Sequence, residues 1–309
     1  MKMYRKILII PVMIAMLVIN SACQSTTSAN SVSGKPTIMV TYSILGAVVK
    51  DLVGDQANVV VSMPNGQDPH EWEPSARDIE TLTHADLVVQ NGLGLEGGME
   101  KALAQAKEAG VTIFTASDHI TVRKMGVGEG IPSGDPDQAI GADDPHLWVD
   151  PIAIKQIVAA LSDTLKADLN LDVSTRAVDL ETRLDQLNQT ITDKVNTLPQ
   201  DQRKLVTGHE SLGYFAERYG FKLVGAIVPS LTTQAEISAS ELSALKTLIE
   251  KNHVKAIFTE LGTPPAVAES IGKETGVQVV SVSTHILPED GSYFTFMNEL
   301  SETIINALK

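Results

Sequence analysis

The chain has 309 residues, of which 43% are hydrophobic and 20% charged, and its formal net charge is −14 at pH 7. So large an acidic excess argues against a nucleic-acid-binding protein and is compatible with the attraction of cations. The single cysteine cannot form an intrachain disulfide, so the fold must depend on its hydrophobic core.

The N-terminal segment is typical of a lipoprotein signal peptide. A basic start precedes an apolar run at 7–19, which small residues separate from the single cysteine, Cys23. The run is shorter than the roughly 20 residues that cross a bilayer, so we predict removal of residues 1–22 and lipidation of Cys23. A transmembrane anchor or an ordinary secreted protein is the alternative, because Asn20 stands where a lipobox usually has an aliphatic residue. Residues 23–35 are rich in Ser, Thr and Asn and predict a flexible tether.

Beyond the tether, short β-branched runs alternate with longer amphipathic segments. The first series of predicted strands covers 37–41, 58–62, 86–90 and 111–115, with helical patterns at 44–53 and 99–109. The second series covers 204–208, 222–228, 254–260 and 277–282, with helical patterns at 210–219, 236–251 and 265–275. This alternation predicts parallel α/β architecture, and the length favours two lobes of similar plan.

A long amphipathic pattern separates the two series. Apolar residues recur at spacings of three or four from Val173 to Leu198, and Pro199 ends the pattern. We therefore predict an α/β protein with two lobes, 36–170 and 199–309, each with a mainly parallel four-stranded sheet and flanking helices. A rigid linker helix over 171–198 would join them and resist large hinge opening.

Two loops repeat the pattern Asp-Pro-His-x-Trp, in "DPHEWEP" at 68–74 and "DPHLWVDP" at 144–151. Proline restricts the residue before it to extended geometry, so stiffened loops would present the two histidines. In an extended segment a histidine and the residue two positions later face the same side. Trp72 and Trp148 are therefore expected to form an apolar wall beside a site.

Histidines follow several of the predicted strands, where open α/β sheets assemble their sites. These candidates for metal ligation are His70, His146, His209 and His285. Several neutral imidazoles in one cleft would build a site that prefers zinc to harder cations. His84 and His253 precede strands and are expected at the opposite rim, whereas His119 follows a strand but has no partner motif.

These motifs resemble those of the lipid-anchored solute-binding proteins of zinc and manganese ABC importers. The resemblance runs over nearly the whole mature chain, in "GQDPHEWEPSARDIETLTHADLVVQNGLGLE", "DPHLWVDP", "VTGHESLGYFAERYGF" and "IFTELGTPPAVAESIGKETGVQVV". It implies two lobes with a metal buried between them, a rigid linking helix, and metal ligands at His70, His146 and His209.

Two departures from the family pattern concern the metal. Family members commonly have an aspartate a few residues after the last strand, where this chain has His285, with Glu289 and Asp290 close behind. We assign His285 as the fourth ligand and keep Asp290 as the alternative. Zinc-importing relatives often have a histidine-rich loop before the second ligand, but residues 120–145 contain no histidine. The acidic residues of this loop include Asp135, Asp137, Asp143 and Asp144.

The resemblance implies an extracytoplasmic, high-affinity receptor that captures Zn²⁺ between two lobes and delivers it to the permease and ATPase subunits of an ABC importer. Mn²⁺ is the alternative cargo. We expect a monomer that is anchored to the membrane by lipid, binds no nucleic acid and is not an enzyme.

Two sequence features suggest functions other than a receptor. A zinc hydrolase is suggested by Glu210 beside His209 and by Glu260 at a strand end, but a fourth protein ligand would close the coordination position that catalysis needs. Dinucleotide binding is suggested by a G-x-G-x-x-G pattern at 92–97 with an acidic residue, Asp118, further on. Against it, the preceding strand is third in its series and Glu96 would occupy the pyrophosphate position.

Overall fold

The computed structural model describes residues 34–126, 129 and 140–309. Residues 35–309 form one compact unit. Cys23, the predicted signal peptide and nearly all of the tether lie outside the described residues, as do Asp135 and Asp137 of the acidic loop. Among the described helices, none combines the length and apolar character needed to cross a membrane.

The first half of the described chain forms a four-stranded parallel sheet with the order β2-β1-β3-β4. Its strands are β1 (Thr37–Val40), β2 (Asn58–Val61), β3 (Leu87–Gln90) and β4 (Thr112–Thr115). The helices between them are α1 (Ser43–Val53), α2 (Ala76–Thr83) and α3 (Glu100–Glu108). Short 3₁₀ turns, η1 (Gly97–Met99) and η2 (Ala116–His119), precede α3 and follow β4.

The second half repeats this plan in a parallel sheet with the order β6-β5-β7-β8. Its strands are β5 (Lys204–Thr207), β6 (Lys222–Ala226), β7 (Ala256–Thr259) and β8 (Gln278–Ser281). Its helices are α6 (Gly213–Tyr219), α7 (Ala239–Asn252), α8 (Pro265–Thr275) and α9 (Tyr293–Leu308). A short 3₁₀ turn, η5 (Gln200–Gln202), precedes β5. The predicted α/β class with two parallel four-stranded sheets is confirmed.

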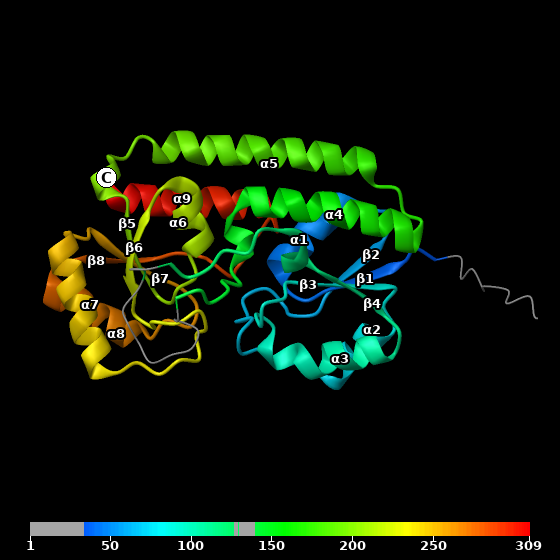
Figure 1. The fold of residues 1–309 in the computed structure, drawn as a ribbon, viewed down its shortest axis with the longest axis horizontal. Helices are drawn as coiled ribbons and strands as arrows, with labels where there is room; N and C mark the ends of the chain where they lie inside the picture. Colours follow the sequence, from blue (N-terminus) through cyan, green and yellow to red (C-terminus); the bar gives the residue numbers. More distant parts are fainter. Residues whose placement is uncertain (1–33, 127–128, 130–139) are drawn as a thin grey trace, which may run out of the picture. The chain divides into compact units, whose positions relative to one another are not determined.

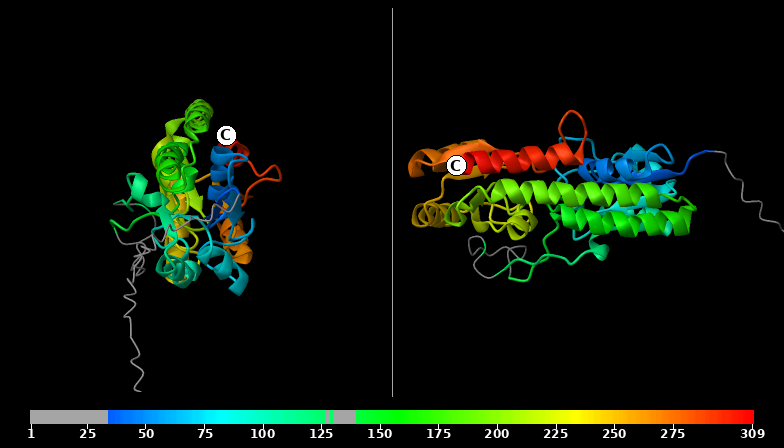
Figure 2. Two further views of the ribbon diagram at one scale, coloured as in Figure 1. Left: turned by 90° about the vertical axis from the view of Figure 1, so that its right-hand side faces the viewer. Right: turned by 90° about the horizontal axis from the view of Figure 1, so that it is seen from above.

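Two long helices, α4 (Pro151–Leu169) and α5 (Ser174–Val195), lie between the sheets in sequence and pack side by side (Figures 1 and 2). Helix α5 buries one apolar stripe and contacts α1 and α4 as well as α6 and α9, so it touches helices that flank both sheets. It begins three residues later and ends three residues earlier than the 171–198 pattern suggested. The lobe boundaries at 170 and 199 stay a prediction.

Helix α4 was not predicted as a separate element. The Asp150 carboxylate accepts a hydrogen bond from the backbone N–H of Ile152, and Pro151 occupies the first helical position, which together start the helix. Asn170 ends it in a left-handed conformation. Helices α2 and α9 were also not predicted.

The largest hydrophobic cluster includes side chains from both sheets and from α4, α5 and α9. Among its fully buried members are Leu45 under the first sheet, Phe258 in the second, and Trp148 between them in sequence. Helices α2 and α3 cover the first sheet with a separate small cluster, and α7 and α8 cover the second with another. The two sheets are therefore joined through one shared core along the side occupied by α4, α5 and α9 (Figure 1).

Candidate metal centre

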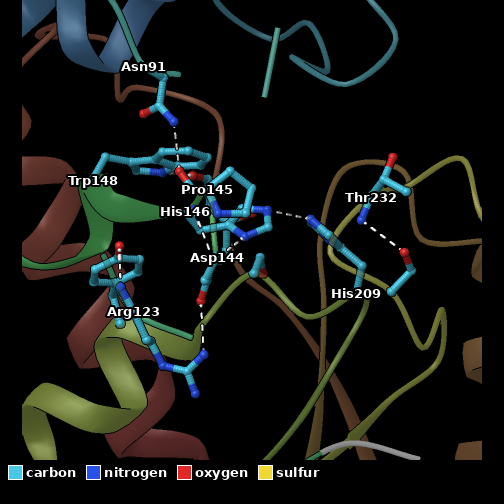
Figure 3. Close-up of polar contacts among 12 residues, drawn as sticks. Asn91, Arg123, Asp144, Pro145, His146, Trp148, His209 and Thr232 are labelled. Carbon is cyan, nitrogen blue, oxygen red and sulfur yellow. Dashed lines mark hydrogen bonds and ion pairs between the residues drawn. The ribbon is translucent and has the colours of Figure 1, made fainter. Parts of the chain in front are cut away.

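Four histidines from distant parts of the chain converge at one point. They are His70, His146, His209 and His285, all buried, and one ring nitrogen of each lies within 4.8 Å of the others. The Nε2 atom of His146 is 3.3 Å from Nε2 of His70 and 3.1 Å from Nε2 of His209. The rings of His209 and His285 stack with their centroids 5.4 Å apart. Figure 3 shows the facing rings of His146 and His209.

The repeated Asp-Pro-His motif has a structural reason beyond proline stiffness. In each copy the aspartate accepts a hydrogen bond from the backbone N–H of the histidine two residues later, at 2.9 Å for Asp68 and His70 and 3.0 Å for Asp144 and His146. This is an Asx turn, which fixes the backbone that carries the imidazole. His70 lies in the loop between β2 and α2, and His146 immediately precedes η4 (Leu147–Val149).

The second aspartate also contacts the imidazole of its own motif. Asp144 Oδ1 lies 2.8 Å from His146 Nδ1, while its Oδ2 accepts a hydrogen bond from Arg123 Nη1 at 3.1 Å (Figure 3). A carboxylate at Nδ1 keeps the proton there, so the lone pair of Nε2 points into the histidine cluster. Burial lowers the pKa of His146, although Asp144 opposes this shift.

Glu260, just beyond β7, holds the histidine that follows β5. Its Oε1 accepts a hydrogen bond from the backbone N–H of His209 at 3.0 Å and lies 2.9 Å from the ring Nδ1. Ser211 Oγ donates to the same carboxylate. Burial alone would raise the pKa of Glu260, but His209 and the surrounding hydrogen bonds lower it to about 2. Burial also lowers the pKa of His209, yet the nearby carboxylates, Glu260 first, raise it overall.

The same glutamate reaches the fourth histidine through a threonine. Thr284 Oγ1 donates to Glu260 Oε2 and lies 2.7 Å from His285 Nδ1. Since the hydroxyl proton goes to the carboxylate, the hydroxyl oxygen accepts from Nδ1–H, and Nε2 is left with a free lone pair. That Nε2 is buried and has no hydrogen-bond partner among the described residues. Burial holds the pKa of His285, and likewise that of His70, well below the usual value.

The two tryptophans have different roles. Trp148 is fully buried, its ring lies 5.3 Å from the rings of both His146 and His285, and its Nε1 donates to the backbone oxygen of Thr284 at 2.7 Å. Trp72 is half-buried and packs against the edge of the shared core and against the small cluster of α2 and α3. The expectation that Trp72 lines the site is not met, because residues 70–71 form a turn and the two-residue alternation of an extended segment does not apply.

Asp290, the alternative fourth ligand, is exposed and lies at the start of α9. Its carboxylate accepts hydrogen bonds from Ser292 N at 3.0 Å and from Thr295 Oγ1 at 2.6 Å. These bonds lower its pKa. The carboxylate therefore serves the helix N-terminus, and His285 is the residue of this segment that reaches the cluster.

The remaining sequence candidates lie elsewhere. His84 and His253 are exposed beside the strand starts, as expected, and His119 is exposed and stacks on Phe114. Glu210 is buried next to His209, and burial raises its pKa to about 7. Asp143 forms an ion pair with Lys124.

The G-x-G-x-x-G turn is filled by its own acidic residue. The buried carboxylate of Glu96 accepts hydrogen bonds from Thr41 Oγ1 and from the backbone N–H groups of Asn91 and Gly92. Those N–H groups would otherwise face a phosphate. Glu96 thus occupies the place that a dinucleotide would need.

Arg123 and Thr284 were not recognised from the sequence as parts of the site. They contact Asp144 and Glu260 across separations of 21 and 24 residues, which no local pattern encodes. Asp144 was noted as the first residue of its Asp-Pro-His motif and as an acidic loop residue, but not as a partner of the imidazole. Its role is marked by the two-residue spacing to His146.

Comparison with known proteins decides the family. The family described as zinc-uptake complex component A periplasmic matches residues 38–307 of the chain. The chain belongs to this family. Its members are solute-binding components of metal importers, so the chain is a metal-binding receptor and not an enzyme.

Relatives of the family cover nearly the whole chain. The manganese-binding lipoprotein MntA of Halalkalibacterium halodurans is 25% identical over 307 residues, 96% of this chain and 97% of that protein. The manganese ABC transporter substrate-binding lipoprotein PsaA of Streptococcus pneumoniae is 27% identical over 302 residues, 93% of each chain. The structure of the periplasmic zinc binding protein TroA from Treponema pallidum is 25% identical, covers 89% of this chain and 99% of its own, and has a TM-score of 0.73.

Proposed function

We propose that the chain captures Zn²⁺ between its two sheets, bound by the Nε2 atoms of His70, His146, His209 and His285, and delivers the ion to a membrane permease. The observation that carries this proposal is the convergence of four buried ring nitrogens at one point. At least three of these imidazoles have an oxygen partner near Nδ1, which leaves Nε2 free to bind a cation. Buried lone pairs that face one another without a proton or cation between them are unfavourable.

The donor set supports zinc over manganese. Four imidazole nitrogens suit tetrahedral Zn²⁺ at about 2.0–2.1 Å, whereas Mn²⁺ prefers more oxygen ligands. The carboxylates of Asp144 and Glu260 contact the imidazoles at Nδ1, on the side away from the converging Nε2 atoms. Relatives include both zinc-binding and manganese-binding proteins, so manganese is the second candidate cargo.

The relatives' names support a proposal for the cellular setting. MntA and PsaA are named lipoproteins, which supports acylation of Cys23 after removal of residues 1–22, with 23–35 as the tether. We infer a monomer outside the cytoplasm that docks on the permease of an ABC importer whose ATPase subunit drives transport.

Metal competition tests the cargo. The chain, stripped of metal and titrated with Zn²⁺ or Mn²⁺ against a chromophoric chelator, should bind one Zn²⁺ per chain and prefer Zn²⁺ to Mn²⁺, as the nitrogen donor set demands. Equal or tighter binding of Mn²⁺ would contradict the zinc assignment and leave the metal-receptor function in place.

The pH dependence of zinc binding should reflect the buried imidazoles. Lowered pKa values keep His70, His146 and His285 neutral at pH values below the usual histidine pKa of about 6.5, so protons compete with zinc only at still lower pH. His209, with its raised pKa, is the one ligand that would release a proton near neutrality. Calorimetry in buffers of different ionisation enthalpy should therefore find about one proton or fewer displaced per zinc near pH 7.5, contributed mainly by His209, and more protons as the pH falls. An affinity that does not change down to pH 5 would argue against histidine ligands.

A further inference from the structure

Two loops that carry metal ligands from different sheets are joined by a single side chain. Asn65 lies in the β2–α2 loop, five residues before His70, and Leu287 lies two residues after His285. Asn65 Oδ1 accepts a hydrogen bond from the backbone N–H of Leu287 at 2.8 Å, and its Nδ2 donates to the backbone oxygen of Leu287 at 2.9 Å. The amide thus pairs with both polar groups of one residue, as a neighbouring β-strand would.

The Asn65 side chain is also held by a helix that flanks the first sheet. Ser43 Oγ, in the first turn of α1, donates to Asn65 Oδ1 at 3.2 Å. Three groups therefore hold one exposed amide in a defined orientation. A pairing of this kind restrains the distance between the His70 loop and the His285 loop.

A second polar contact crosses to the same loop. Gln234, in the segment between β6 and α7, donates from Nε2 to the backbone oxygen of His70 at 3.1 Å. A pocket of about 260 Å³ lies here, lined by His70 and Gln234 together with residues of the β3–η1 turn. His70 is 7% exposed, against 0–3% for the other three histidines, so solvent reaches the cluster most readily at this ligand.

The opposite side of the cluster is closed by the hydrophobic core. Trp148 Nε1 donates to Thr284 O, Tyr293 Oη donates to Trp148 O, and both aromatic side chains belong to the core shared by α4, α5 and α9. Parting the loops on this side would expose fully buried apolar surface. On the Asn65 side, Leu287 packs only partly buried against the core, and the polar contacts that cross are hydrogen bonds at the surface, which water can replace.

We propose that Asn65 is a positioning residue that clasps the His70 loop to the His285 loop and sets the rate at which bound metal is released. Gln234 also restrains the His70 loop, through its hydrogen bond to the backbone oxygen of His70. The inference rests on the proposed metal-receptor function. It assigns metal release to parting of these two loops, with the helices α4, α5 and α9 staying packed.

The test is the rate of zinc dissociation into excess chelator, followed by stopped flow. Asn65→Ala removes both bonds to Leu287 and should speed dissociation roughly tenfold, with the association rate within about twofold of the parent. Asn65→Asp keeps the acceptor but places a carboxylate against the Leu287 carbonyl, so it should also speed dissociation. The control is Gln67→Ala, because Gln67 is an exposed residue of the same loop whose side chain forms no hydrogen bond with the described residues.

The thermal midpoint of the metal-free protein distinguishes a specific effect on metal release from a general loss of protein stability. Asn65 is exposed, so Asn65→Ala should leave this midpoint close to that of Gln67→Ala while the dissociation rates differ. Dissociation from Asn65→Ala at the parent's rate, or equally fast dissociation from Gln67→Ala, would overturn the clasp while zinc binding by the parent persists. A parent chain that fails to bind zinc at all would instead overturn the proposed function.

Discussion

Replacing His285 by alanine should lower zinc affinity more than roughly 100-fold, beyond the loss expected when only an orienting partner is removed. The change deletes one of four converging nitrogens and opens a coordination position to water. Asp290→Ala is the matched control, because Asp290 is exposed and bonded to the start of α9. Its zinc affinity should stay within about twofold of the parent. Competition with a chromophoric chelator measures both variants.

A third variant asks what the fourth nitrogen does for metal choice. His285→Asp supplies an oxygen ligand in place of nitrogen, so it should retain metal and narrow the preference for Zn²⁺ over Mn²⁺. Parent-like affinity in His285→Ala combined with weak binding in Asp290→Ala would transfer the fourth ligand to Asp290. The receptor function would survive that result.

Replacing Trp148 by alanine should lower the free energy of unfolding of the metal-free protein by about 3–5 kcal/mol. The side chain is fully buried in the core that joins the two sheets, and its loss also leaves the backbone oxygen of Thr284 without its donor. Denaturant titration followed by circular dichroism measures the change.

Trp72→Ala is the control for Trp148→Ala, since it deletes the same side chain from the other copy of the motif. Trp72 is only half-buried, so the loss of unfolding free energy should be clearly smaller. If the two variants were equally destabilised, Trp148 would not be a special support of the shared core.

The strands and the four histidines could be predicted because their signals are local. Each strand is a short β-branched run, and each of these histidines follows such a run or closes the loop after one, so parallel pairing brings them to the same end of their sheets. Helix α4 was missed although "VDP" at 149–151 contains its N-cap and first-turn proline, because the motif was interpreted only as a ligand loop. Reading Asp150-Pro151 as a helix start would have found it.

Contacts between distant segments could not be predicted in this way. Glu260 was noted at the end of a predicted strand, and its link to His285 depends on Thr284. Asp144 is held by Arg123, which lies 21 residues earlier in the same long loop. Trp72 shows the opposite error, since a local rule for extended chain was applied to a residue that follows a turn. Such features depend on tertiary packing, which a single sequence does not specify at the level of side-chain partners.

Anomalous scattering at the zinc edge, from crystals of the zinc-loaded protein, tests the central claim most directly. We predict one peak per chain, bonded at about 2.0–2.1 Å to Nε2 of His70, His146, His209 and His285 and to no other atom. A peak away from these histidines would contradict the account, as would a coordination sphere completed by a carboxylate or by water in place of His285.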